Sequence, residues 1–98
     1  MERRLVWNKR PTAFLKKALK RISTESLSNA EKVEEAILIN LDQSLENPER
    51  YPLDKFKTNN NGIFRAFETH SYRVAYKFTE KEIRVLRIRH VKQEPKEY

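Results

Sequence analysis

Apolar residues recur at helical spacing in the first half of the chain and alternate with polar residues over most of the second half. Within residues 14–22 and again within residues 30–45, the apolar positions lie three or four apart, which predicts two amphipathic helices. The first helix is expected to start in residues 8–11, because their asparagine caps a helix and their proline is tolerated in a first turn. The second is expected to start at the Ser-x-x-Glu capping box of residues 28–31 and to end before Pro48.

A short strand is predicted before the helices, at residues 3–7, and three longer ones after them, at residues 63–68, 72–78 and 82–90. The segment between the helices and these strands is irregular, with prolines and an Asn-Asn-Asn-Gly run that mark a loop. The last three strands are joined by turns short enough for antiparallel hairpins. This β-α-α-β-β-β order predicts one α+β domain over residues 1–98, with two helices packed on one face of a four-stranded antiparallel sheet.

Alternation along the strands divides their side chains between the two faces of the sheet. We expect an apolar set to pack against the helices, since this hides the most apolar area: Tyr72, Val74, Tyr76, Phe78, Leu86 and Ile88. The opposite face is then open, and four arginines project from it: Arg65, Arg73, Arg87 and Arg89. Three apolar residues are expected to lie among these arginines: Phe67, Ala75 and Val85.

The charge of the chain is unevenly distributed. The formal net charge of +7 over 98 residues conceals a basic block (residues 1–23, +7), an acidic block (residues 24–54, −6) and a second basic block (residues 55–98, +6). Such blocks produce polarised faces and favour nucleic acid or an acidic protein as partner. Arginines on a rigid sheet suit phosphate in particular, because each guanidinium offers a planar fork of donors.

Several classes of protein and of site are excluded by what the sequence lacks. Without cysteine there is no disulfide framework, thiol chemistry or Cys-ligated zinc, and a cytoplasmic protein is expected. No apolar run approaches the roughly 20 residues that span a bilayer, and the first residues lack the apolar core of a signal peptide, so no membrane association is expected. The carboxylates of the second helix have no histidine at metal spacing, so no metal site is expected. A chain this short has one modest core without room for a deep cofactor cavity, so no other cofactor is expected.

Three features of the second half together resemble one family of proteins. The features are the run Tyr-Arg-Val-Ala-Tyr at residues 72–76, the strand at residues 83–90 that ends on His90, and the late Tyr98. In these features the chain resembles the RelE/ParE toxins of bacterial type II toxin–antitoxin systems. The β-α-α-β-β-β order fits this family as well. The resemblance implies a toxin held inactive by a cognate antitoxin protein, with one of two activities: cleavage of mRNA on the ribosome, as in RelE, or poisoning of DNA gyrase, as in ParE.

The resemblance also implies roles for individual residues. Arg73 falls where RelE-like toxins bind a phosphate, and Tyr98 lies at the spacing of their late catalytic tyrosine. Lys92 falls near a basic residue that acts on the leaving group. Arg65 approximates a basic position that those toxins use in catalysis.

The sequence departs from the RelE pattern on the strand that carries Arg65. RelE-like toxins have two closely spaced lysines there, whereas this chain has one arginine, and Lys55 and Lys57 lie in the preceding loop. Metal-free cleavage of RNA needs a base for the 2′-hydroxyl, and arginine is a poor base because its pKa stays above about 12. The candidates for the base are Lys55, Lys57, His90 and Tyr98, and further phosphate contacts are expected from Arg87 and Arg89.

The leading hypothesis from the sequence is a toxin that cleaves mRNA on the ribosome and so arrests translation, without a cofactor. Its expected partners are the ribosome, the mRNA and the antitoxin. The alternative is a poison of DNA gyrase without nuclease activity, which the missing second lysine favours. A third possibility is a basic nucleic-acid-binding module without toxicity, which the same electrostatics permit.

Overall fold

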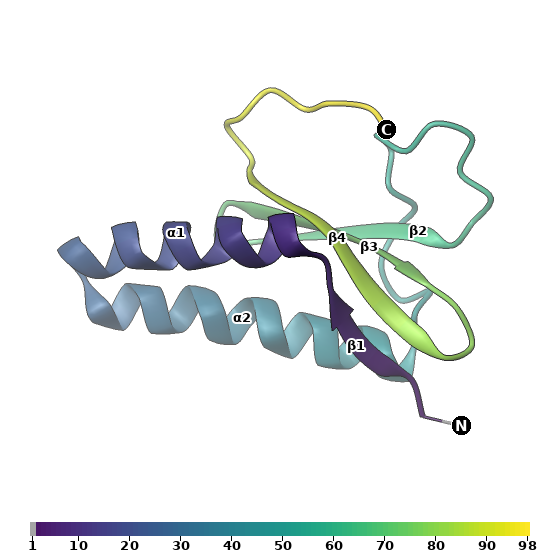
Figure 1. Cartoon of the computed structure of the whole chain (residues 1–98), viewed down its shortest axis with the longest axis horizontal. Coiled ribbons are helices and arrows are strands. Elements are labelled where there is room, and N and C mark those ends of the chain that lie inside the picture. The colour runs from purple at the N-terminus through teal and green to yellow at the C-terminus, as the bar shows by residue number, and fades with distance from the viewer. Residues whose placement is uncertain (1) are drawn as a thin grey trace.

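The computed structural model describes residues 2–98 and contains two helices and four strands (Figure 1). Their order is β1 (Arg4–Trp7), α1 (Lys9–Glu25), α2 (Leu27–Glu46), β2 (Phe64–Thr69), β3 (Tyr72–Phe78) and β4 (Glu82–His90). The predicted α+β fold and β-α-α-β-β-β order are therefore confirmed. Neither helix of this part of the chain combines the length and the apolarity that crossing a membrane requires.

The two helices form a hairpin whose turn is a single residue, Ser26. Ser26 has an extended backbone (φ −158°), its N–H donates to the Ile22 carbonyl at 2.9 Å, and its hydroxyl accepts from the Asn29 N–H at 3.1 Å. One residue thus ends α1 and caps α2. The predicted capping box at residues 28–31 is wrong, because the Ser26 cap starts α2 earlier and leaves Ser28 inside its first turn.

The sheet is mixed, with the strand order β1-β4-β3-β2. β2, β3 and β4 form the predicted antiparallel hairpins, but β1 runs parallel to β4, with Arg4 opposite Glu82. The prediction of a purely antiparallel sheet is therefore wrong. No hairpin turn joins β1 to β4, so turn length does not fix their relative direction, and alternation within a strand carries no information about it.

A bulge in β4 shifts the alternation of that strand. Tyr76 pairs with Val85 and Ala75 pairs with Arg87, so Leu86 is an extra residue in the ladder. At a bulge, two residues of one strand lie opposite a single residue of the partner strand. The alternation of inward-facing and outward-facing side chains therefore shifts by one residue across the bulge. Val85 is consequently buried in the core (0% exposed) and Leu86 is only half-buried, which reverses the sequence prediction for both.

The core lies between the helical hairpin and one face of the sheet. The helices contribute Leu15, Ala18, Val33, Ile37 and Leu41, and the strands contribute Phe67, Tyr72, Val74, Tyr76, Ile83, Val85 and Ile88. Phe67 was predicted on the open face, but it lies opposite Val74 and its ring packs 4.9 Å from that of Tyr51. Burial of each large apolar side chain here contributes about 1.5–3 kcal/mol to folding.

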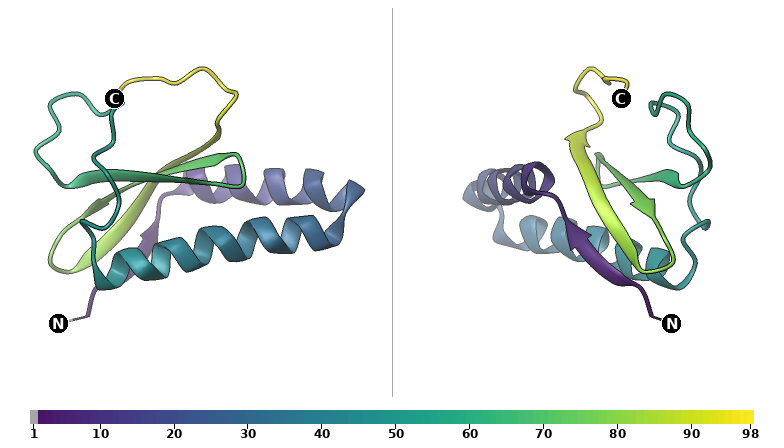
Figure 2. Two further views of the ribbon diagram at one scale, coloured as in Figure 1. Left: turned by 180° about the vertical axis from the view of Figure 1, so that it is seen from behind. Right: turned by 45° about the vertical axis from the view of Figure 1, so that its right-hand side comes forward.

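The second face of the sheet is covered by irregular segments. Figure 2 shows the loop between α2 and β2 and the segment after β4 meeting on the side of the sheet away from the helices. Phe56 and Tyr98 are joined there by a main-chain hydrogen bond of 3.0 Å, although they are far apart in the sequence. The face that the sequence predicts to be open is therefore partly closed.

Candidate functional site

Three of the four predicted arginines lie together on this second face. Arg73 of β3 is opposite Arg89 of β4, and Ala75 of β3 is opposite Arg87 of β4. Cross-strand partners point to the same side of a sheet, and the small side chain of Ala75 forms the floor between the guanidinium groups. We call Arg73, Arg87 and Arg89 the arginine cluster.

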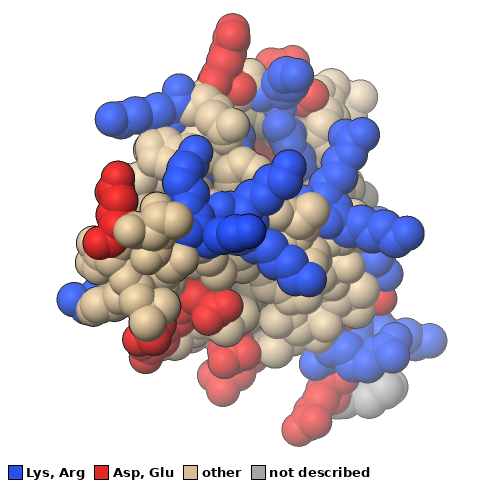
Figure 3. Space-filling view, turned by 60° about the vertical axis from the view of Figure 1, so that its left-hand side comes forward, with Lys and Arg blue, Asp and Glu red and all other residues tan. Residues whose placement is uncertain are grey.

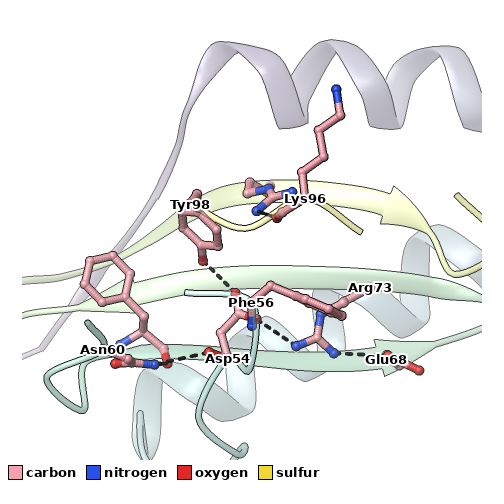
Figure 4. A network of polar contacts seen from close by, with 9 residues as sticks. Asp54, Phe56, Asn60, Glu68, Arg73, Lys96 and Tyr98 are labelled. Atoms are coloured by element: carbon pink, nitrogen blue, oxygen red, sulfur yellow. Dashed lines mark hydrogen bonds and ion pairs between the residues drawn. The ribbon is translucent and has the colours of Figure 1, made fainter. Parts of the chain in front are cut away.

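A buried carboxylate from the preceding loop is inserted into the arginine cluster. Asp54 is 3% exposed, and its Oδ1 lies 2.8 Å from Nη2 of Arg73 and accepts from the Phe56 N–H at 3.1 Å (Figure 4). The Tyr98 hydroxyl donates to Oδ2 of Asp54 at 2.6 Å. The other terminal nitrogen of Arg73, Nη1, lies 3.0 Å from Oε2 of Glu68. The Asp54 side chain thus accepts three hydrogen bonds, from Arg73, Phe56 and Tyr98.

Sequence reasoning missed Asp54 and counted it only as one acid of the acidic block. The available signal was weak, namely a single aspartate in an irregular loop. Neither periodicity nor a motif indicates that this aspartate faces the arginines. The contact depends on how the loop folds back over β3, which is a tertiary feature.

The segment after β4 crosses the arginine cluster and is tied to it by its own main chain. Arg87 donates to the Lys96 carbonyl at 2.7 Å, and Arg89 donates to the Gln93 carbonyl at 3.0 Å. Tyr98 then pairs with the loop, since its N–H donates to the Phe56 carbonyl and its carbonyl accepts from the Thr58 N–H at 2.7 Å. We call residues 93–98 the strap.

Aromatic rings lie against the cations of the site. The Phe56 ring centroid is 4.9 Å from the guanidinium carbon of Arg73 and 5.0 Å from that of Arg89. The Tyr98 ring lies 4.4 Å from the Arg87 guanidinium and 5.2 Å from Nζ of Lys57. Cation–π contacts of this kind stabilise a partly desolvated cation by about 1–2 kcal/mol. They also occupy the ring faces on which a base would otherwise stack.

Burial and hydrogen bonding set the protonation states of the site. Burial alone would raise the pKa of Asp54, but the hydrogen bonds from Tyr98, Arg73 and the Phe56 N–H outweigh it and lower that pKa. Burial, together with the adjacent Asp54 carboxylate, raises the pKa of the Tyr98 phenol, which therefore stays protonated. Burial, followed by the like charges of Arg73 and Arg87, lowers the pKa of Arg89.

Arg65 does not belong to the arginine cluster. It is opposite Tyr76, so its side chain leaves the sheet on the core side, and the prediction that it shares a face with Arg73 is wrong. Its guanidinium instead donates to the carbonyl oxygens of Gly62 at 2.9 Å, Tyr51 at 3.1 Å and Glu49 at 3.5 Å. Arg65 therefore anchors the loop that carries Asp54.

His90 and Lys92 are also separated from the arginine cluster. His90 is opposite Tyr72 on the helix side of the sheet, where the two rings lie 5.2 Å apart, and its Nδ1 accepts from the Lys92 N–H at 3.1 Å. The Lys92 side chain is exposed beyond the strand end. Across residues 2–98, no hydrogen bond or ion pair joins either residue to Arg73.

The two loop lysines differ in position. Lys57 lies in the site, because its Nζ is 4.7 Å from the Phe64 ring and donates to the Tyr98 carbonyl at 3.2 Å. Lys55 is exposed at the margin, with its Nζ 5.3 Å from the Phe56 ring. The structure thus brings together Lys57, Tyr98 and the arginine cluster, with Asp54 added, and leaves Lys55, Arg65, His90 and Lys92 outside.

Comparison with models of known protein families identifies the family of the chain. The family model described as the ParE toxin of the type II toxin–antitoxin system parDE matches residues 5–95. The chain belongs to this family. No curated protein matches the toxin. Membership makes it the toxin component of a type II toxin–antitoxin system, with a cognate antitoxin as its partner, and confirms the resemblance on residues 72–90.

The helices of the toxin carry opposite charges on their exposed faces. α1 exposes Lys9, Arg10, Lys16, Lys17, Lys20 and Arg21, whereas α2 exposes Glu31, Glu34, Glu35, Asp42 and Glu46. Figure 3 shows Lys and Arg side chains gathered across the middle of one face of the toxin, with acidic side chains at its margins. The blocks of the sequence therefore become polarised surfaces, and the local field exceeds what the net charge of +7 suggests.

No cluster suited to a metal ion is found in the described part of the toxin. Among residues 2–98, no three His, Asp or Glu side chains lie together in a way that could hold one. Asp54 and Glu68 both pair with Arg73.

Acid is expected to destabilise the toxin in part through Asp54. Folding lowers the pKa of this carboxyl below its ordinary value of 3.8. The Asp54 carboxylate therefore contributes fully to the free energy of unfolding when the pH is well above 3.8. This contribution is lost as the pH falls below 3.8 toward the pKa of the folded state. Urea midpoints measured from about pH 7 to about pH 2.5 should therefore fall less steeply for Asp54→Asn than for the wild type. The exposed Asp42→Asn should follow the wild type, and parallel curves for all three proteins would contradict the assignment.

Proposed function

We propose that the toxin acts by binding its target rather than by cleaving RNA, and that this target is DNA gyrase. The observation that carries the proposal is the state of Tyr98, whose hydroxyl donates a hydrogen bond to the buried Asp54 carboxylate at 2.6 Å. Cleavage of RNA needs a base beside the phosphate ligands. A protonated phenol that is fixed to a carboxylate does not serve as that base.

The other candidate bases support the same proposal. His90 lies on the opposite side of the sheet from the arginine cluster, and Lys55 is at its margin. Lys57 directs its ammonium to the carbonyl oxygens of Thr58 and Tyr98, both at 3.2 Å. The matching family model is that of the ParE toxins, for which the family resemblance implies gyrase as the target. Because the chain belongs to a toxin family, we do not propose the non-toxic nucleic-acid-binding module.

Ribosome-dependent cleavage of mRNA is the second candidate, and one observation favours it. Arg73, Arg87, Arg89 and Lys57 form a group of four cations beside Tyr98, and such a group suits the negative charge that develops on a phosphate during cleavage. In this candidate function the Tyr98–Asp54 hydrogen bond has to break before the phenol can take part.

The two functions can be distinguished by inducing the toxin gene in a bacterium and measuring whether DNA damage or a loss of protein synthesis comes first. We expect early DNA-damage signalling while incorporation of labelled amino acids continues, and accumulation of cleaved plasmid when purified toxin is incubated with gyrase. Immediate loss of amino-acid incorporation, with cut mRNA on purified ribosomes, would sink the gyrase proposal. His90→Gln adds an internal check, because a toxin that does not use His90 as a base should keep its full toxicity.

A further inference from the structure

A continuous groove runs along the helical hairpin, between α1 and α2. The two helices lie side by side (Figure 1), and the groove consists of two hollows of about 400 Å³ and about 380 Å³, which adjoin because Leu19 and Glu34 line both. Trp7 of β1 lies at one end, and Leu27 lies at the other end, beside the turn. Leu38, which also lines the groove, is 40% exposed and Leu27 is 64% exposed. The groove therefore leaves apolar surface in contact with water.

The two edges of the groove carry opposite charges. Lys16 and Lys20 line it on the α1 edge, and Glu31 and Glu34 line it on the α2 edge. All four residues are exposed, and none of them belongs to an ion pair found within residues 2–98. The groove thus has an apolar floor between two cations and two carboxylates, and its lining has no net charge.

This charge pattern indicates the kind of partner that fits the groove. A lining without net charge does not attract nucleic acid, although the toxin as a whole carries a net charge of +7. The same net charge repels a second copy of the toxin, so self-association needs local contacts that outweigh this repulsion. Two edges of opposite charge supply such contacts. A half-turn of a second copy about the line of the groove places each edge against the edge of opposite charge.

We propose that the groove is an interface between two copies of the toxin, which pack hairpin against hairpin as a four-helix bundle. The half-turn keeps every residue at its own level along the helices. Lys16 and Glu34 line the same hollow, so Lys16 of each copy lies beside Glu34 of the other copy. Lys20 and Glu31 line the second hollow and pair in the same way. In helical bundles, charged residues beside an apolar seam determine partner and orientation.

The size of the interface predicts a weak dimer. The helices are 17 and 20 residues long, so the hairpin presents a face of about 25 Å by about 20 Å, or roughly 500 Å² per copy. A total of roughly 1,000 Å² lies at the lower limit for a specific interface, so we expect a dissociation constant of about 10–100 µM. The interface goes beyond the proposed function, because its formation requires neither gyrase nor the antitoxin.

Sedimentation equilibrium of the purified full-length toxin tests the interface, at about 50 mM salt to limit the screening of charges. The average mass should rise from 11.8 kDa toward twice that value as the concentration rises from about 5 µM to about 500 µM. Lys16→Glu and Glu34→Lys should each self-associate at least tenfold more weakly, because each variant places like charges opposite each other.

An equimolar mixture of these two variants should associate as tightly as the wild type does. In the mixed dimer, the new carboxylate at position 16 of one variant faces the new ammonium at position 34 of the other, and the native Glu34 and Lys16 face each other as well. This recovery separates a specific contact from a change in net charge. A mixture that stays monomeric would therefore contradict the proposed pairing.

Lys17→Glu and Glu35→Lys are the matched controls, since both residues are exposed on the same helices and line neither hollow. Each should self-associate as the wild type does, with melting temperatures recorded to show that every variant is folded. A wild type that stays monomeric at the highest concentration overturns the proposal, and so does an equal loss of association in the groove and control variants. A monomeric toxin whose Leu38→Gln variant binds the antitoxin more weakly would assign the groove to the antitoxin instead.

Discussion

Replacing Asp54 by alanine is expected to lower the free energy of unfolding by about 3 kcal/mol, and the melting temperature by more than about 10 °C. Asp54 is 3% exposed and the side chain of Arg73 is 11% exposed, so the substitution leaves a nearly buried cation with only Glu68 as its partner. The Tyr98 hydroxyl and the Phe56 N–H also lose their acceptor. Breaking a buried pair has this large effect because the remaining charge stays desolvated.

Urea unfolding at neutral pH, followed by circular dichroism, measures this effect. The matched control is Asp42→Ala, which removes an exposed carboxylate from α2 and should change the free energy of unfolding by no more than about 0.5 kcal/mol. Asp54→Asn should fall between the two, since its amide oxygen still accepts a hydrogen bond. A loss below about 1 kcal/mol for Asp54→Ala would mean that the loop relaxes and rehydrates Arg73.

Replacing Arg65 by methionine is expected to lower the free energy of unfolding by about 2 kcal/mol. The Arg65 guanidinium joins three carbonyl oxygens of the loop between α2 and β2, at Glu49, Tyr51 and Gly62. Methionine keeps much of the aliphatic stem but donates no hydrogen bond. The three carbonyls then need water, and the loop is held less firmly.

The same unfolding measurement applies, with Arg21→Met as the control because Arg21 is exposed on α1. The family resemblance assigns Arg65 a catalytic position, whereas in the structure it lies on β2 and holds the loop. An Arg65→Met protein with unchanged stability and no toxicity would restore the catalytic interpretation. Lower stability with toxicity retained at equal soluble expression would support the structural one.

Helices, strands and their order follow from the sequence because each depends on local periodicity. The apolar stripes of α1 and α2 extend over several turns, and the strands end at clear turn residues. Alternation also places Arg73, Arg87 and Arg89 on one face, since each of these positions depends only on the strand that carries it. These features needed no knowledge of the tertiary structure.

Other features were wrong or missing because they depend on contacts between distant segments. The bulge at Leu86 moves Val85 into the core, and nothing in the alternation of β4 reveals that one residue is unpaired. Arg65 was placed on the wrong face because alternation groups it with Phe67 but does not tell which of the two faces of β2 packs against the core. Asp54 was missed because a loop residue has no periodicity from which its direction can be inferred.

The parallel pairing of β1 with β4 has a consequence for the synthesis of the toxin. Arg4 pairs with Glu82, roughly 80 residues later, so β1 leaves the ribosome long before its partner strand exists. Pairing across so long a loop comes late, because the chain entropy has to be lost before the contact stabilises it. Arg87 and Arg89 are carried by the same late strand. The arginine cluster therefore forms only after β4 has been made, and a chain that has not yet reached β4 presents no such surface to the cell.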